Sequence, residues 1–168
     1  MKVITLGNDL LRRKAEAVKD INGEIVKIAG EMIEILHKQK GVGLAGPQIG
    51  LMQRIFVIHI EGDEPRVFIN PSITATSQET VKYEEGCLSI PGVWADVVRP
   101  RAVRVQAWNE KGRPFTVETE GILARVILHE YDHLEGVLFI DRLSPRKRDR
   151  VLAKLNKIAA GEESPGTE

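Results

Sequence analysis

The sequence is poor in several features that mark particular protein classes. It has one cysteine among 168 residues, so no disulfide forms within the chain and an oxidising compartment is not implied. Lysine plus arginine and aspartate plus glutamate both number 24, which gives no global electrostatic reason to expect a DNA or membrane partner. The apolar runs are too short to span a bilayer, and the first nine residues turn polar too soon for a secretory signal. We therefore expect a cytoplasmic protein without a DNA or membrane partner.

The chain does contain enough apolar material for one hydrophobic core. A length of 168 residues with 42% hydrophobic residues fits a single domain. No internal repeat or low-complexity segment interrupts it before its end. We expect residues 1–168 to form one monomeric domain, in which 161–168 is a flexible tail.

Hydrophobic periodicity predicts helices at both ends of the chain and strands between them. An amphipathic stripe predicts a helix over 23–38, and Ser144-Pro145 is a typical start for a last helix. An apolar run over 122–134, closed by Gly136, predicts a central helix. Between these lie a glycine-dense loop at 41–50, strands at 54–60, 66–70 and 74–84, a strand end at Ile90-Pro91, and a hairpin of 97–108 with 114–119. This pattern predicts an α+β fold, with antiparallel sheets packed around the central helix.

The central helix carries two histidines one helical turn apart, His129 and His133. Imidazoles at this spacing share a face, so one divalent metal can bridge them, and the carboxylate of Glu130 can reach a water on that metal. The preceding residues 122–128 are mostly apolar, so this helix should be buried rather than solvated. Because buried, unpaired histidine and glutamate are costly, the pattern predicts a metal centre.

A catalytic metal of this kind needs a third protein ligand and one open position. His37, near a helix end, and His59, within a strand, do not lie in segments typical of ligation. Cys87 does, because Gly86 allows a close turn beside it and a thiolate suits borderline or soft divalent ions. A buried, inert cysteine is the plainer alternative. We predict that the metal ligands are Cys87, His129 and His133.

Three segments together resemble the signature motifs of the peptide deformylase family. They are residues 41–48 (GVGLAGPQ), 85–89 (EGCLS) and 129–133 (HEYDH), in the family's order and with similar separations. The resemblance covers nearly the whole chain, to about Leu155, and includes the order of helices and strands. Two positions depart from it: Gly46, where alanine is usual, and Leu128, where glutamine is usual. We expect the glycine to loosen the loop and Leu128 to remove one hydrogen bond near the metal, with consequences for rate.

The resemblance implies a metal-dependent hydrolase that removes the formyl group from the N-terminal formyl-methionine of newly synthesised polypeptides. It implies attack by a metal-bound hydroxide, with Glu130 as general base and then general acid. The side-chain amide of Gln48 and the backbone N–H of Leu88 match the family's oxyanion donors. The implied ion is Fe(II), although a Cys/His/His set also tolerates Zn(II), Ni(II) or Co(II).

The same resemblance suggests where a formylated nascent peptide binds. The glycines of residues 41–46 permit the peptide to pair with exposed backbone as an added strand, and Val42 and Gly43 are the predicted main-chain contacts. A pocket for the methionine side chain is expected nearby. Its predicted walls are Glu85, Leu123 and Ile127, with Trp94 at its rim.

Asp132 faces away from the ligands by helical spacing. We expect it to pair with Arg99 and so to hold the central helix against the preceding sheet, whereas an exposed aspartate is the alternative. The last helix carries a set of cations: Arg146, Lys147, Arg148, Arg150, Lys154 and Lys157. A solvated face is the favoured interpretation of these, and contact with ribosomal RNA near the peptide exit is the functional alternative.

Two other classes of protein share part of this pattern. A protease of the zincin type takes its third ligand downstream of the second histidine, where the candidates are Glu135, Asp141, Asp149, Glu162 and Glu163. The second class is not an enzyme. In it, the same ligands would hold a structural zinc, or the chain would be a deformylase that has lost its activity and serves as a binding module. A structural site needs a fourth protein ligand, for which the sequence offers no second cysteine.

Overall fold

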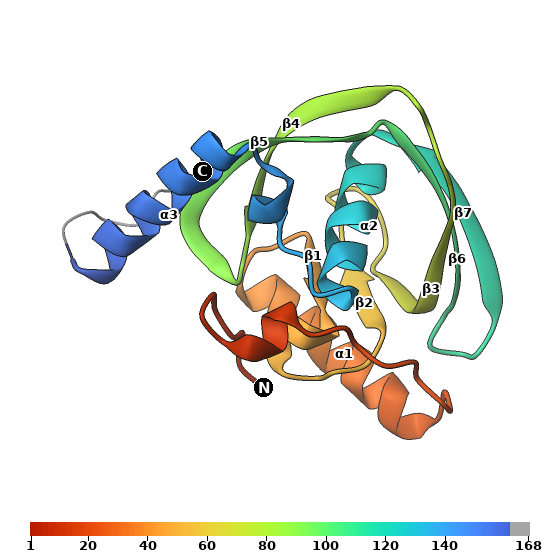
Figure 1. The fold of residues 1–168 in the computed structure, drawn as a ribbon. Helices are drawn as coiled ribbons and strands as arrows, with labels where there is room; N and C mark the ends of the chain where they lie inside the picture. Colours follow the sequence, from red (N-terminus) through yellow and green to blue (C-terminus); the bar gives the residue numbers. More distant parts are fainter. Residues whose placement is uncertain (162–168) are drawn as a thin grey trace.

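Two antiparallel sheets surround helix α2 in the computed structural model (Figure 1), which describes residues 1–161. The tail expected at 161–168 lies, apart from Gly161, outside these residues, and the single domain over 1–168 stays a prediction. In chain order the elements are η1 (Asp9–Arg12), α1 (Gly23–Lys38), β1 (Gly43–Ala45), η2 (Gly46–Ile49), β2 (Ile55–Ile58), β3 (Arg66–Thr76), β4 (Thr80–Cys87), β5 (Ile90–Pro100), β6 (Ala102–Trp108), β7 (Pro114–Glu120), α2 (Gly121–Leu134), η3 (Phe139–Arg142) and α3 (Pro145–Ala159).

The larger sheet has the strand order β1-β2-β3-β6-β7, and the smaller one pairs β4 with β5. Every neighbouring pair is antiparallel. Helix α2 runs inside the curve of the strands, while α1 and α3 lie on the outside (Figure 1). The predicted α+β class, with antiparallel sheets around a central helix, is confirmed. Within residues 1–161 no helix is both long and apolar enough to cross a membrane.

Three predicted strand boundaries are wrong, because long strands pass from one sheet to the other. The strand expected at 74–84 is interrupted at 77–79, where the hydroxyl of Ser77 donates to the carbonyl of Glu79 and accepts from the N–H of Ala102. The strand expected at 97–108 breaks beside it, at Arg101. Ile90-Pro91 begins β5 instead of ending a strand. Side-chain alternation keeps its phase across the second crossing, and the residues around the first are almost all exposed, so periodicity does not reveal the change of partner at either.

The short strand β2 is buried on both faces and so separates two parts of the core. Phe56 and Ile58 belong to the apolar cluster on the α2 side, whereas Ile55 and Val57 belong to the cluster on the α1 side. The ring of Phe56 stacks on Phe68, with the centroids 4.7 Å apart. Covered from both sides, β2 provides a rigid base for β1 and the loop next to it.

The helix boundaries follow the capping residues of the sequence. The side chain of Asn22 accepts from the N–H groups of Glu24 and Ile25 at the start of α1. Gly136, with φ of 73°, follows the C-cap of α2, as predicted. Ser144 caps α3, whose partly buried apolar residues pack on a third cluster: Val151, Leu152, Leu155 and Ile158.

Candidate active site

Cys87, at the end of β4, meets two histidines on one face of α2. One ligand atom from each of Cys87, His129 and His133 lies within 4.8 Å of the others, and this is the only such group of three among residues 1–161. The distance from Cys87 Sγ to His133 Nε2 is 3.3 Å. The structure therefore brings together the three residues predicted as ligands, although Cys87 is far from the histidines in sequence.

An irregularity in the β4–β5 pair places Cys87. The register moves from Glu85 opposite Ala95 to Cys87 opposite Ile90, so several β5 residues bulge between them. The indole of Trp94, within this bulge, lies against Gly86, and a Cβ atom there would collide with the ring. The glycine at position 86 thus allows the close approach predicted there, and the group that comes close is the indole ring of Trp94.

The residues present fit a divalent transition metal. One thiolate and two imidazoles are donors that such ions prefer, and three protein ligands leave a position open. The Nδ1 atom of His129 contacts Glu85, which leaves its Nε2 atom as the ligand. The buried Oε1 atom of Glu130 and the buried Nδ1 atom of His133 have no hydrogen-bond partner within the described chain. A water held beside the carboxylate would satisfy the former atom.

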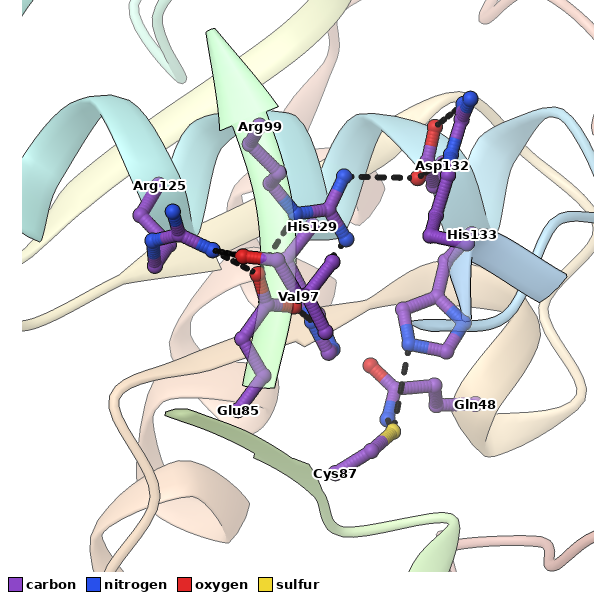
Figure 2. A network of polar contacts seen from close by, with 10 residues as sticks. Gln48, Glu85, Cys87, Val97, Arg99, Arg125, His129, Asp132 and His133 are labelled. Atoms are coloured by element: carbon purple, nitrogen blue, oxygen red, sulfur yellow. Dashed lines mark hydrogen bonds and ion pairs between the residues drawn. The ribbon is translucent and has the colours of Figure 1, made fainter. Parts of the chain in front are cut away.

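Glu85 orients His129 and is itself held by two arginines (Figure 2). Its carboxylate accepts from Arg99 Nε at 2.6 Å and Nη2 at 3.0 Å, and from Arg125 Nη1 at 2.6 Å. Burial would raise the pKa of Glu85, but the hydrogen bonds to His129 and Arg99 and the charge of Arg99 lower that pKa to about 2. Glu85 lines the cleft, and its carboxylate is paired with an imidazole and two arginines; its contact with a peptide stays a prediction. The sequence did not indicate this pairing, because both arginines come from other elements.

Asp132 pairs with Arg99, as predicted, with 2.9 Å between Oδ2 and Nη1. A second cation missed by the sequence analysis, Arg142 from η3, donates to both oxygens of the same carboxylate, at 2.8 Å and 3.1 Å. Arg99 therefore bridges two anions, Glu85 beside His129 and Asp132 on α2. This bridge holds α2 at a set distance from β5.

Burial and hydrogen bonds shift the pKa values of the two histidines in opposite directions. Burial alone would lower the pKa of His129, but hydrogen bonds with Cys87 and Glu85 outweigh it and raise that pKa well above its usual value. Burial and the positive charges of His129 and Arg99 lower the pKa of His133. Because a ligating imidazole must be neutral, His129 would have to give up one ring proton in order to hold a metal ion.

Glu130 is 3% exposed and lies between α2 and the edge strand β1. Burial raises the pKa of Glu130 to about 7, against the attraction of the His129 charge. A Cβ atom added to Gly43 would be 2.5 Å from Glu130 Oε2, so the backbone of β1 sets where this carboxylate lies. A buried carboxylate with a pKa near neutrality is typical of a general acid or base.

The side chain of Gln48, in η2, is fixed at both ends. Its Oε1 atom accepts from the N–H of Ala45 at 2.9 Å, and its Nε2 atom donates to Ser89 Oγ at 3.2 Å and lies 3.5 Å from Cys87 Sγ. The N-terminal segment holds both loops, because Ile4 N–H donates to Gln48 O and Leu6 N–H donates to Ser89 O. An amide N–H donor is thus preset beside the three predicted ligands (Figure 2).

A cleft of about 550 Å³ opens onto this group. Four predicted substrate contacts and the predicted donor Leu88 line it: Val42, Gly43, Glu85, Trp94 and Leu88. The predictions for Leu123 and Ile127 are wrong, because they face the core cluster on the other side of α2. Ile122 and Val126 line the cleft instead, two turns and one turn before Glu130 respectively.

The other residues considered as a third ligand lie outside the group of Cys87, His129 and His133 in the described chain. His37 and His59 contact one another, with 2.7 Å between Nε2 and Nδ1. Glu135 pairs with Arg54, and Asp141 pairs with Arg12. Glu162 and Glu163 lie outside the described residues. Nothing in the described chain brings a downstream carboxylate into the group of Cys87, His129 and His133.

Gly46 and Leu128, the two residues that depart from the family's motifs, both lie in closely packed surroundings. A Cβ atom at Gly46 would lie 2.6 Å from the carbonyl oxygen of Leu51, so the chain folds too closely over this glycine for an alanine. Leu128 packs against the core cluster on the α2 side. Gly46 thus permits a tight loop, which differs from the loosening that we expected.

Comparisons with known proteins agree with this geometry. A family model described as polypeptide deformylase matches residues 1–149. A peptide deformylase of Treponema pallidum (strain Nichols) is 45% identical over 154 residues, which cover 92% of this chain and 94% of that protein. Another, of Clostridium botulinum (strain Alaska E43 / Type E3), is 49% identical over 140 residues, or 83% of this chain and 94% of that protein.

Solved structures show the same similarity. A peptide deformylase from Synechococcus elongatus, in complex with actinonin, matches with a TM-score of 0.89 and 40% identity over 93% of this chain and 88% of that one. The peptide deformylase from Thermus thermophilus matches with a TM-score of 0.87 and 42% identity over 96% and 98% of the two chains.

Proposed function

The chain belongs to the polypeptide deformylase family, whose activity is to hydrolyse the formyl group from the N-terminal formyl-methionine of new polypeptides, and we propose the residues that perform it here. The observation that carries the proposal is the convergence of Cys87, His129 and His133 beside the buried carboxylate of Glu130. The protein is therefore a metallohydrolase that acts on a linear amide.

The three ligands would hold one divalent ion. When bound, such an ion acts as a Lewis acid that lowers the pKa of water and polarises the formyl carbonyl. We propose Fe(II) as the native ion, while Zn(II), Ni(II) and Co(II) are compatible with the same donors. Elemental analysis of protein purified without oxygen identifies the ion.

Glu130 would be the general base and then the general acid. Its Oε1 atom is buried without a partner, so it is free to take a proton from the attacking water. It then gives that proton to the methionine nitrogen as the bond to the formyl carbon breaks. A cation bound nearby would lower the carboxyl pKa below the value of about 7 that burial produces, and this would keep Glu130 ionised near neutral pH.

The negative charge that develops on the formyl oxygen requires hydrogen-bond donors. Gln48 Nε2 supplies one, because Ala45 holds the amide with its Nε2 atom towards Cys87 and Ser89. The backbone N–H of Leu88, next to Cys87, would supply the other. The Gln48 amide needs little reorganisation during the reaction, since the fold already holds it in place.

Replacing Gln48 by leucine should lower kcat by about 10²–10³-fold and leave the metal content unchanged, as when one oxyanion donor is lost. Steady-state kinetics with a formylated tripeptide, together with elemental analysis, measure both quantities. Ser89→Ala is the matched control, because it removes a partner of the Gln48 amide and leaves the amide in place. Wild-type kcat in Gln48→Leu would remove this residue from the mechanism.

The peptide would lie along β1, which is an edge strand of the larger sheet. The Val42 carbonyl already accepts from the N–H of His59 at 2.9 Å. The main-chain groups proposed for the substrate are therefore the N–H of Val42 and the backbone of Gly43 on the outer edge of β1. The methionine side chain would enter the apolar part of the cleft between α2 and β4, beside Ile122 and Val126.

Replacing Gly43 by alanine should reduce kcat/KM by about 10²-fold, because a small displacement of a catalytic group has effects of this size. The added methyl group would collide with the Glu130 carboxylate. Gly30→Ala is a suitable control, since its Cβ atom would meet nothing within 4 Å. Unchanged kcat/KM in Gly43→Ala would show that Glu130 does not need its present position.

Incubation of the metal-loaded protein with formyl-Met-Ala-Ser tests the proposed function. The expected products are formate and intact Met-Ala-Ser. Cleavage of the Met–Ala bond would favour the protease, and a retained metal without formate release, with Fe(II), Ni(II) and Co(II) each supplied, would favour a structural zinc or an inactive relative. Both results contradict the proposal in distinguishable ways.

Formylated nascent peptides are the partner that the activity requires, and we place the reaction in the cytoplasm with a monomeric protein. A finer proposal concerns α3, whose exposed cations would meet ribosomal RNA: Arg146, Lys147, Arg148, Arg150, Lys154 and Lys157. The solvated face remains the simpler account of them. Co-sedimentation with ribosomes that is unchanged by charge reversal at these positions would contradict the contact.

A further inference from the structure

A second cavity of about 290 Å³ adjoins the cleft near the start of α2. Three residues line both spaces and therefore separate them: Tyr83, Ile122 and Arg125. The far walls of this outer cavity are largely apolar, with Val81 and Pro100 among them. Arg101 and Glu120, which form an ion pair at 3.6 Å, complete its lining.

Arg125 is the immobile part of this partition. Its Nη1 atom donates to Glu85 Oε2 at 2.6 Å and to the carbonyl of Val97 at 3.0 Å, and its Nη2 atom donates to the carbonyl of Val81 at 2.7 Å. The residue is 8% exposed. A guanidinium with three acceptors from two strands cannot swing aside as a surface arginine does.

Tyr83 covers the same guanidinium from the other side. The ring centroid lies 5.7 Å from Arg125 Cζ, a distance at which a cation and an aromatic ring attract. Tyr83 is 56% exposed, so its ring is a movable cover on a fixed base. An apolar chain that advanced past Ile122 would have to displace the ring or desolvate the cation without a replacement partner.

We propose that Arg125, covered by Tyr83, closes the methionine pocket and sets the length of side chain that the enzyme accepts. The proposal rests on the proposed function for the orientation of the peptide. The outer cavity is the space into which a longer unbranched side chain extends once the guanidinium is removed. Arg125 is thus a specificity-determining residue, and the outer cavity is closed to the substrate in the wild-type protein.

Removal of Arg125 leaves the metal-binding group supported. Glu85 keeps both of its hydrogen bonds from Arg99 and its contact with His129. A change of selectivity in Arg125→Leu therefore reports on the pocket and not on the orientation of the imidazole. A merely structural role for Arg125 would weaken binding of short and long side chains alike.

The experiment compares two tripeptides, Met-Ala-Ser and one in which methionine is replaced by 2-aminooctanoic acid, whose side chain is two atoms longer. Calorimetry measures binding of the unformylated peptides, and formate release measures kcat/KM for the formylated ones. Arg125→Leu should raise the ratio of long to short peptide at least about tenfold in both measurements, the size of effect that a methylene or two produces in an apolar pocket. Tyr83→Ala should raise it less, because the guanidinium remains.

Arg104→Leu is the matched control, since Arg104 lies on β6 and donates to Thr74, and it should leave the ratio at its wild-type value. Ratios in both Arg125→Leu and Tyr83→Ala within twofold of wild type would overturn the proposal. If Arg125→Leu does not fold, the exposed Tyr83 position decides the question by itself. A wild-type protein that releases no formate, while the binding ratio shifts as described, would contradict the proposed function and leave this inference standing.

Discussion

Replacing Glu130 by glutamine lowers kcat for deformylation by about 10³-fold, within the range that general acid–base catalysis supplies, while the metal content stays at the wild-type level. Glutamine has nearly the same shape and cannot take a proton, so the variant separates proton transfer from binding. Formate release and elemental analysis measure the two quantities. Glu84→Gln, also on the cleft lining and next to Glu85, is the matched control and should keep most of the activity. Comparable kcat in both variants would exclude Glu130 as the base.

When both proteins are free of metal, Glu130→Gln should be more stable than the wild type at high pH. Because burial raises the pKa of Glu130 from 4.5 to about 7, the folded state favours the neutral carboxyl. The stability that the neutral carboxyl contributes to the folded state is fully present below pH 4.5 and is lost as the pH rises through 7, where the buried group must ionise. Glutamine carries no such charge, so Glu130→Gln should gain roughly 1–3 kcal/mol in unfolding free energy relative to wild type at pH 8. Denaturant unfolding at pH 5 and pH 8 measures the gain, and equal differences at both pH values would contradict it.

Replacing Arg99 by leucine should lower the free energy of unfolding by about 3 kcal/mol, the lower end of the cost of breaking a buried ion pair. Arg99 is 4% exposed and is the one side chain that contacts both Glu85 and Asp132 within the described chain. Each anion keeps another arginine, Arg125 or Arg142, and this limits the loss. A fall in melting temperature of about 6–12 °C follows from the usual scaling for a chain of this size. Arg101→Leu, which removes an exposed arginine two residues later, should change the melting temperature little.

The loss in Arg99→Leu should shrink at low pH, because Arg99 is among the groups that hold the pKa of Glu85 at about 2. A lowered carboxyl pKa contributes stability that is present above pH 4.5 and is lost as the pH falls through the folded pKa. Without Arg99 the folded pKa of Glu85 rises towards its unfolded value, so the variant has less of this contribution to lose on acidification than the wild type. Denaturant unfolding, followed by circular dichroism at several pH values between 2 and 6, measures the difference in free energy of unfolding. A difference of the same size at every pH would show that Arg99 does not stabilise the carboxylate.

The parts of the site that depend on local spacing were predictable from the sequence. His129, Glu130 and His133 lie on one helix, and a helical period places both imidazoles on the same face in any fold. The caps at Asn22 and Ser144 bond to residues two or three positions away. Such features require only the neighbouring chain, so the sequence determines them before any tertiary contact forms.

The choice of Cys87 required the motif as well as the spacing, because it lies far from His129 along the chain. The pairing of Asp132 with Arg99 was predicted from helical phase, whereas the second arginine on the same carboxylate was not. The predictions for Leu123 and Ile127 were wrong because the periodicity of a helix that is buried all round does not show which face borders a cleft.

The sequence by itself therefore determined the fold class, from the order of its periodic segments, and the two histidine ligands with the carboxylate between them, from spacing along a single helix. Only the tertiary structure decided that Glu85 serves His129, that two strands cross between sheets at residues 77–79 and 101, and that Arg125 separates two cavities. The reason is physical: a buried charge is stabilised by whichever partners the packed elements bring to it, and those partners come from segments that are distant along the chain.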